Sequence, residues 1–173
     1  ECINDHGGII TLVDSNMIMA LWKPDKMRQY TIKSTDCAVE CLNLGSQFSK
    51  KWDDRQTDFF KPQIGMSSGP LVMGNFGSEE RLYFIAAGDA LNVAAALAKA
   101  NREYDSHLLI PELFKPELGQ RYPLRFVDHI KLPGYMQPVK AYELLNSTSS
   151  DFKSEPELMD LFDKGMAQYT NMK

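Results

Sequence analysis

A single stretch near the middle of the chain, residues 74–97, constrains the fold more than any other part of the sequence. It reads GNFGSEERLYFIAAGDALNVAAAL, with two polar glycine steps, an aromatic and β-branched run, and an alanine-rich segment after Gly88 and Asp89. Glycine permits positive φ and close approach of neighbouring backbones, so the first half predicts a strand, a polar turn at 74–78 and a second strand. Asp89 is well placed to cap or start a helix. We therefore expect strand, turn, strand and helix within this short segment.

The order of residue types in this stretch resembles that of an enzyme domain. It follows GN-x-GS-x-x-R and then G-D-x-x-N-x-A-x-x-L, which is similar to the class III adenylate/guanylate cyclase catalytic domain. The resemblance covers roughly residues 7–145, the later part of such a domain. It implies an α/β (α+β) fold, a ferredoxin-like sandwich with an antiparallel-rich sheet and flanking helices. It also implies a dimer whose interface holds the sites where ATP or GTP is cyclised with Mg²⁺ or Mn²⁺.

Length and composition limit the classes of function. A chain of 173 residues suits one domain with one core. No apolar run approaches the roughly 18 residues of a membrane span, and no signal peptide is visible. We therefore expect a cytoplasmic domain, either of a soluble protein or of a larger membrane-bound sensor protein. The net charge of −4 argues against nucleic acid as a partner, because neutralising phosphates requires a basic patch.

The flanking segments predict the remaining elements from their apolar spacing and turn residues. An amphipathic helix is expected with an apolar face formed by Cys37, Cys41, Leu44, Phe48 and Trp52. Strands are expected at 9–13, 17–22, 62–67, 70–74, 107–110, 122–132 and 139–145, with a short helix at 111–118.

The domain boundaries follow from composition. Residues 1–146 are expected to form a partial class III cyclase domain, and 147–154 have the composition of a linker. Residues 155–173 are predicted to form a C-terminal amphipathic helix, because Ser154 and Glu157 form a capping box at its start. We expect this helix to be the start of a further segment. In the resembled family the opening strand bears an aspartate, and this sequence lacks that strand. We therefore expect the sequence to be an excerpt of a longer polypeptide.

The resemblance implies two metal-binding aspartates, and the second belongs to a Lys-x-x-Gly-Asp hairpin. The matching residues 12–20 read LVDSNMIMA. Asn16 stands where the metal aspartate would be, and Leu12 stands where the purine-contacting lysine would be. A neutral amide offers a dication one carbonyl oxygen and no charge. Asp14, two positions before Asn16, is a weak candidate for a displaced metal ligand, although a solvated turn aspartate is the simpler interpretation.

The resemblance also implies nucleotide contacts around the central helix. The second purine-selecting position is Ile85, which offers no hydrogen bond to a base edge. Gly88 and Asn92 match positions near the substrate, and Asn92 is the only retained catalytic position. One turn later the family places an arginine, and this chain has Ala96. Asn92 equally suits a structural role, since asparagine readily bonds nearby backbone groups.

The cysteines and histidines give no metal-binding spacing of the CxxC kind. Cys37 and Cys41 lie one helical turn apart in the apolar stripe, and Cys2 makes the set odd in number. We interpret Cys37 and Cys41 as reduced core residues rather than as metal ligands. No metal or base role is assigned to the three scattered histidines, His6, His107 and His129.

The sequence is compatible with three functions. The first is a cyclase-family domain acting in cyclic AMP biosynthesis and intracellular signal transduction, weak or inactive by itself and completed by a homodimer partner or a second cyclase half. The second is a non-catalytic pseudo-cyclase that serves as a dimerisation, regulatory or nucleotide-sensing module. The third is a sensor that holds a small ligand in the vacant cleft.

Overall fold

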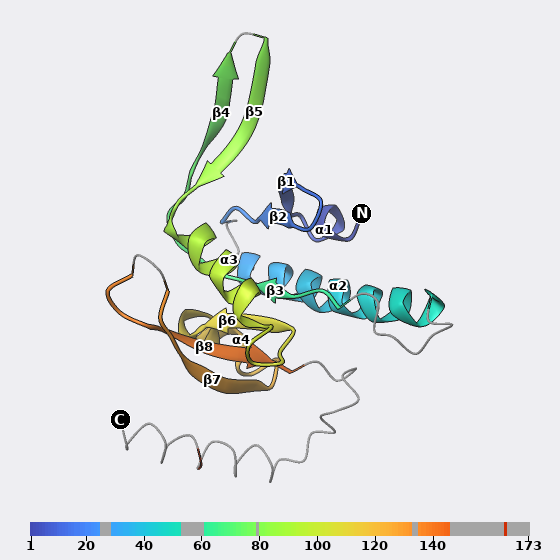
Figure 1. Ribbon diagram of the computed structural model, residues 1–173, viewed down its shortest axis with the longest axis vertical. Coiled ribbons are helices and arrows are strands. Elements are labelled where there is room, and N and C mark those ends of the chain that lie inside the picture. The colour runs from blue at the N-terminus through green and yellow to red at the C-terminus, as the bar shows by residue number, and fades with distance from the viewer. Residues whose placement is uncertain (25–28, 53–60, 79, 133–134, 146–164, 166–173) are drawn as a thin grey trace. The chain divides into compact units, whose positions relative to one another are not determined.

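A computed structural model describes the chain except for residues 25–28, 53–60, 79, 133–134, 146–164 and 166–173 (Figure 1). The linker predicted at 147–154 lies outside the described residues, as does the helix predicted at 155–173 apart from Gly165. The described chain divides into two compact units, residues 1–62 with 67–95 and residues 63–66 with 96–173. The elements run in the order α1 (Cys2–Asp5), β1 (Ile9–Val13), β2 (Ile18–Leu21), α2 (Tyr30–Trp52), β3 (Ile64–Gly65), β4 (Val72–Ser78), β5 (Arg81–Ala87), α3 (Asp89–Ala100), β6 (Leu108–Pro111), η1 (Glu112–Phe114), α4 (Lys115–Leu118), β7 (Leu124–Ile130) and β8 (Val139–Leu144).

The second unit is built on a four-stranded sheet with the strand order β3-β6-β8-β7. The pair β3–β6 is parallel, and β8 runs antiparallel to both β6 and β7. All four residues of the inner strand β6 are buried, as expected for a strand covered on both faces. The core of this unit consists of fully buried apolar side chains, among them Leu97, Leu108, Leu109, Ile110, Leu118 and Ala141.

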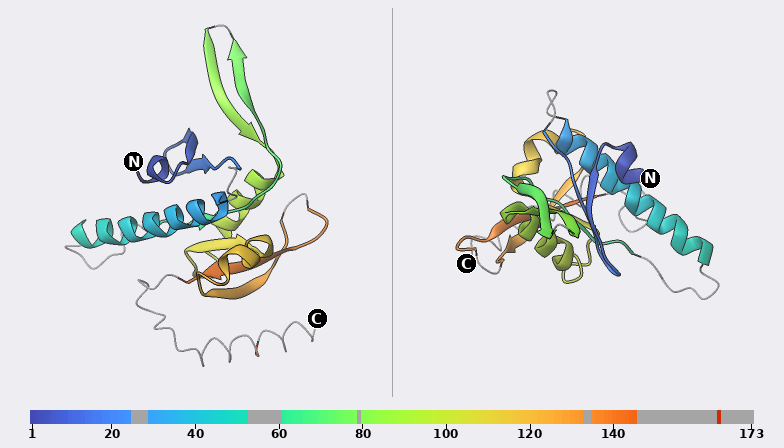
Figure 2. Two further views of the ribbon diagram at one scale, coloured as in Figure 1. Left: turned by 180° about the vertical axis from the view of Figure 1, so that it is seen from behind. Right: turned by 90° about the horizontal axis from the view of Figure 1, so that it is seen from above.

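The first unit contains two antiparallel hairpins and the long helix α2 (Figure 2). In the hairpin β1–β2 the register shifts between Ile10 and Leu12. The strand predicted at 9–13 is confirmed with the same bounds. Fewer side chains are deeply buried in this unit, and its two hairpins expose many large apolar residues, among them Val13, Ile18, Val72, Leu82 and Tyr83.

The polar turn predicted at 74–78 is wrong, because those residues belong to strand β4. Gly74 pairs with Ile85, and Ser78 pairs with Arg81 at the end of the hairpin. Gly77 has φ +144, and a Cβ at that position would lie 1.8 Å from the carbonyl oxygen of Arg81. Glycine is therefore needed there for close approach of the two strands rather than for the turn itself.

Helix α3 begins at Asp89, as the sequence predicts. Gly88, between β5 and α3, has φ +154, and a Cβ there would meet the carbonyl oxygen of Pro70 at 2.7 Å. The buried side chains of α3 include Ala90, Val93 and Leu97, which lie on one face at helical spacing. The glycine thus sets the direction in which the helix leaves the hairpin.

The structure confirms only part of the apolar face predicted for α2. Cys37 is 1% exposed, but Leu44 and Phe48 are 46% and 49% exposed. The more buried side of the helix carries small and polar residues instead, among them Thr31, Ser34, Thr35, Ala38 and Ser49. Apolar spacing located the helix but did not show how much of its surface is covered.

The predicted fold class, a mixture of helices with antiparallel-rich sheets, is confirmed. The strands are grouped in three separate sheets, and β3–β6 is the single parallel pair among the described strands. Among the described residues, no helix combines the length and the apolar character that crossing a membrane requires.

Candidate nucleotide-binding site

The first group of predicted site residues lies on the hairpin β1–β2. Leu12 lies on β1, paired with Met19 across the hairpin, and Asn16 lies in the connection between the strands. The N–H of Asp14 donates to the carbonyl of Met17 (2.9 Å), which closes this connection. The Asp14 carboxylate accepts a hydrogen bond from the backbone N–H of Ser15 (2.6 Å). Asp14 and Asn16 are both exposed.

Strand β5 carries Ile85, the second position at which the resemblance predicts a purine contact. Ile85 is 43% exposed and pairs with Gly74, and Leu12 on the neighbouring hairpin is 42% exposed. Part of β1 lies close to β5 within the first unit. Both side chains are hydrocarbon, so neither can donate to or accept from a purine base edge.

The first turns of α3 carry Asn92, the residue predicted to contact the nucleotide. Asn92 is exposed, one turn after Gly88, whose carbonyl accepts the N–H of Leu91 (3.1 Å). Ala96 follows at i+4 on the same side of the helix and is half-buried. An amide there can hydrogen-bond a ribose or phosphate oxygen, but the methyl group of Ala96 contributes no charge.

The described residues do not assemble a carboxylate metal site around these positions. A cluster of three or more potential metal-binding side chains occurs once in the described part of the chain, and it consists of Cys2, His6 and Cys37. Asp14 is the one carboxylate of residues 9–21, and its carboxylate bonds its own turn. This donor set does not fit a site that takes several carboxylate oxygens around Mg²⁺ or Mn²⁺.

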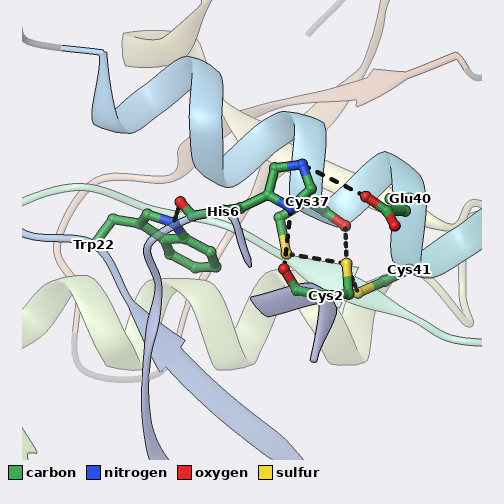
Figure 3. Close-up of polar contacts among 6 residues, drawn as sticks. All are labelled: Cys2, His6, Trp22, Cys37, Glu40 and Cys41. Carbon is green, nitrogen blue, oxygen red and sulfur yellow. Dashed lines mark hydrogen bonds and ion pairs between the residues drawn. The ribbon is translucent and has the colours of Figure 1, made fainter. Parts of the chain in front are cut away.

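The cluster of Cys2, His6 and Cys37 lies on α1 and α2, with Cys41 beside it (Figure 3). The Sγ of Cys2 lies 3.7 Å from the Sγ of Cys37 and 3.7 Å from the Sγ of Cys41. All three cysteines are free, and Cys37 is buried as the sequence predicts. Burial raises the pKa of the Cys2 thiol to about 11, and it also raises the pKa of the Cys37 thiol.

The sequence did not predict that Cys2 and His6 lie close to the two cysteines of α2. The signal that could have found the cluster is a repeated spacing of four positions, Cys-x-x-x-His at the start of the chain and Cys-x-x-x-Cys in the helix. Positions i and i+4 share a helix face. A search limited to CxxC spacing passes over such pairs.

The chain is similar in sequence to adenylate cyclases over most of its length. It is 25% identical, over 96% of its residues, to a terminal-differentiation-specific adenylate cyclase of Dictyostelium discoideum. It is 27% identical, over 83% of its residues, to an adenylate cyclase of Anabaena cylindrica. The chain spans only 8% and 29% of those two proteins. No model of a protein family matches it.

Solved cyclase structures share its fold. The adenylyl cyclase CyaB from P. aeruginosa superimposes with a TM-score of 0.71 at 19% identity, covering 86% of this chain and 76% of that one. The guanylyl cyclase Cya2 superimposes with a TM-score of 0.69 at 21% identity, covering 84% of this chain and 73% of that one. The chain is thus similar in sequence to adenylate cyclases, and it has the fold of the solved adenylyl and guanylyl cyclase structures.

Proposed function

We propose that this chain is a cyclase-family domain of cyclic AMP biosynthesis and intracellular signal transduction, with weak or no turnover by itself. The observation that carries the proposal is the combination of a cyclase fold with uncharged residues at the substrate positions. The match to adenylate cyclases extends over 96% of the chain. Leu12, Asn16 and Ala96 nevertheless replace the charged groups that the family resemblance implies.

The missing charges explain why turnover is expected to be low. Cyclisation of a nucleoside triphosphate develops negative charge on phosphate oxygens, and its stabilisation is a large part of catalysis. Losing an arginine that acts on this charge costs, by analogy with arginine fingers, about 10³–10⁵ in rate. Asn16 adds a second loss, since a neutral amide holds Mg²⁺ or Mn²⁺ far less well than a carboxylate.

Partners of this domain follow from the same reasoning. We propose that a second copy of the chain or a second cyclase half covers the apolar hairpins of the first unit. Val13 is 66% exposed, Val72 69% and Leu82 64%, and exposed apolar patches of this kind mark interaction surfaces. The nucleotide would be ATP or GTP. Cytoplasmic placement within a larger, membrane-bound sensor protein remains part of the proposal.

A non-catalytic role is the second candidate, favoured by the apolar character of both purine-selecting positions. Leu12 and Ile85 leave the base without a hydrogen-bonding partner from β1 or β5. A domain of this kind would dimerise, regulate a neighbour or sense a nucleotide through Asn92, without forming cyclic product.

Nucleotide binding by calorimetry tests the shared basis of both candidates. ATP and GTP are titrated into the chain with Mg²⁺ or Mn²⁺, and into the Asn92→Ala variant. We expect at least one nucleotide to bind, and Asn92→Ala to weaken it about tenfold, the value of one lost hydrogen bond. Asn4→Ala, which removes another exposed helical asparagine, is the matched control and should bind as the unaltered chain does. Absence of binding, or equal binding by both variants, would contradict the proposal.

A further inference from the structure

Two helices of the first unit bring four potential metal donors together. Helix α1 and the residue that ends it supply Cys2 and His6, and α2 supplies Cys37 and Cys41. Each pair is four positions apart, so each helix presents its two donors on one face. One donor atom from each of Cys2, His6 and Cys37 lies within 4.8 Å of the other two. The Sγ of Cys41 lies outside this group but 3.7 Å from the Sγ of Cys2, so a small shift of its side chain would make it the fourth donor.

The two distances from the Sγ of Cys2 match the sulfur–sulfur spacing of a tetrahedral zinc site. With Zn–S bonds of about 2.3 Å, two sulfurs of a tetrahedron lie about 3.8 Å apart. The Sγ of Cys2 lies 3.7 Å from Cys37 Sγ and 3.7 Å from Cys41 Sγ. A disulfide requires an S–S distance of about 2.05 Å and joins only two of the three sulfurs. The arrangement around Cys2 therefore suits a shared metal ion better than a disulfide.

We propose that Cys2, His6, Cys37 and Cys41 form a structural zinc site that fastens α1 to α2. Three thiolates and one imidazole are a ligand set that zinc takes in closed structural sites. The site is distinct from the oxygen-ligand sites that Mg²⁺ and Mn²⁺ prefer. A ring nitrogen of His6 already lies within 4.8 Å of the Sγ atoms of Cys2 and Cys37, and the His6 side chain is 24% exposed. Cys2 and Cys41 are also partly exposed and provide the entry path.

Both ring nitrogens of His6 have oxygen partners. Its Nε2 lies 3.5 Å from the Glu40 carboxylate, and its Nδ1 lies 3.0 Å from the Cys2 carbonyl oxygen, toward the cysteines (Figure 3), so Nδ1 would exchange this carbonyl contact for the metal. A carboxylate behind the imidazole is the arrangement that fixes the tautomer of metal-binding histidines. On the other side, the Trp22 indole N–H donates to the His6 carbonyl (2.9 Å).

The backbone after His6 is fixed by a glycine helix end. Gly7 has φ +73, its N–H donates to Asn4 O (2.9 Å), and the N–H of Gly8 donates to Ile3 O (2.8 Å). This pair of bonds is the Schellman pattern, which terminates a helix with a left-handed glycine. Strand β1 starts directly after it, so a metal at this place would also anchor the hairpin that carries Asn16.

Metal titration of the reduced, chelator-treated chain tests the site. We expect one Zn²⁺ per chain, protection of all three cysteines from alkylation, and a higher Tm at excess zinc. Co²⁺, used as a spectroscopic probe, should give thiolate-to-cobalt charge-transfer absorption and the intense visible bands of tetrahedral coordination. Absence of zinc binding, a cobalt spectrum without thiolate bands, or a disulfide at Cys2 in a zinc-free chain would each overturn the proposal.

Single substitutions test which residues bind the zinc ion, and a control variant tests whether a histidine elsewhere in the chain binds it. Cys37→Ser should weaken zinc binding at least about 100-fold, and Glu40→Gln, which changes only the group behind His6, should weaken it about tenfold. His129→Gln, on β7 in the other unit, is the matched control and should bind as before. Circular dichroism of each metal-free variant checks its fold. Unchanged affinity in a folded Cys37→Ser variant would overturn the assignment, as would loss of binding in His129→Gln.

Discussion

The Sγ atoms of Cys2 and Cys37 lie 3.7 Å apart, although 35 positions separate the two residues in the sequence. Cys37 is 1% exposed, and a thiolate formed there would be poorly hydrated. Burial therefore holds the pKa of both groups above the ordinary cysteine value of about 8.5; the contact with Cys37 opposes this in Cys2, whereas the neighbouring thiols reinforce it in Cys37.

The reactivity of Cys2 should show this raised pKa. Only the thiolate reacts with an alkylating reagent, and the pKa of Cys2 is about 11. In the metal-free chain we expect alkylation of Cys2 at pH 8.5 to be about 100-fold slower than that of an unstructured cysteine peptide. The rate should go on rising about tenfold per pH unit beyond pH 9, up to about pH 11. Mass spectrometry of the Cys2 peptide measures it, and a plateau near pH 9 would show an ordinary thiol.

Gly77 and Gly74 on strand β4 should respond differently to the same substitution. A Cβ at Gly77 would lie 1.8 Å from the carbonyl oxygen of Arg81 at φ +144, whereas a Cβ at Gly74 would have its nearest neighbour at 3.5 Å. Gly77→Ala should therefore lower the free energy of unfolding by about 1–3 kcal/mol, and Gly74→Ala should change it by less than about 0.5 kcal/mol. Urea unfolding compares the two variants. An equal loss of unfolding free energy in the two variants would contradict the close approach of Gly77 to the Arg81 carbonyl.

Asn101 should be the most costly asparagine to remove. It is fully buried, its amide Nδ2 donates to the carbonyl of Ile64 (2.9 Å), and its Oδ1 accepts from the Ser106 hydroxyl (2.9 Å). Asn101→Ala removes the bond to the Ile64 carbonyl and takes the acceptor from the buried Ser106 hydroxyl, at about 1–3 kcal/mol of unfolding free energy. Asn92→Ala removes an exposed side chain and should stay within about 0.5 kcal/mol. Urea unfolding would contradict this account if the two variants lost equal stability.

Most of the order of the elements could be predicted from the sequence, because local signals define them, but the short helix α1 (Cys2–Asp5) was not predicted. Turn residues and β-branched runs locate the strand Ile9–Val13, and Asp89 marks the start of α3. The position of the β4–β5 turn could not be predicted in the same way. Gly77 is required by a cross-strand approach to Arg81, and this contact depends on a register that composition does not reveal.

The candidate sites show the same difference between features set by local sequence and features set by long-range packing. The substituted positions Leu12, Asn16 and Ile85 follow from their place in a long residue pattern, and the structure puts them on the expected strands and connection. The proximity of Cys2 to Cys37 and the burial of Asn101 depend on contacts between distant segments. Such contacts are set by packing, so sequence spacing alone could not show them.

Cyclic nucleotide formation by the purified chain tests the central claim most directly. The chain is incubated with ATP or GTP, each with Mg²⁺ and with Mn²⁺, and cyclic product is quantified by mass spectrometry against a no-protein blank. The account predicts product at the level of the blank in all four mixtures, because Leu12, Asn16, Ile85 and Ala96 provide neither charge for the metal and phosphates nor bonds to the base. Nucleotide-dependent cyclic product at a rate less than about 10³-fold below that of an intact cyclase domain assayed in parallel would contradict it, and its loss in Asp14→Ala would identify Asp14 as a displaced metal ligand.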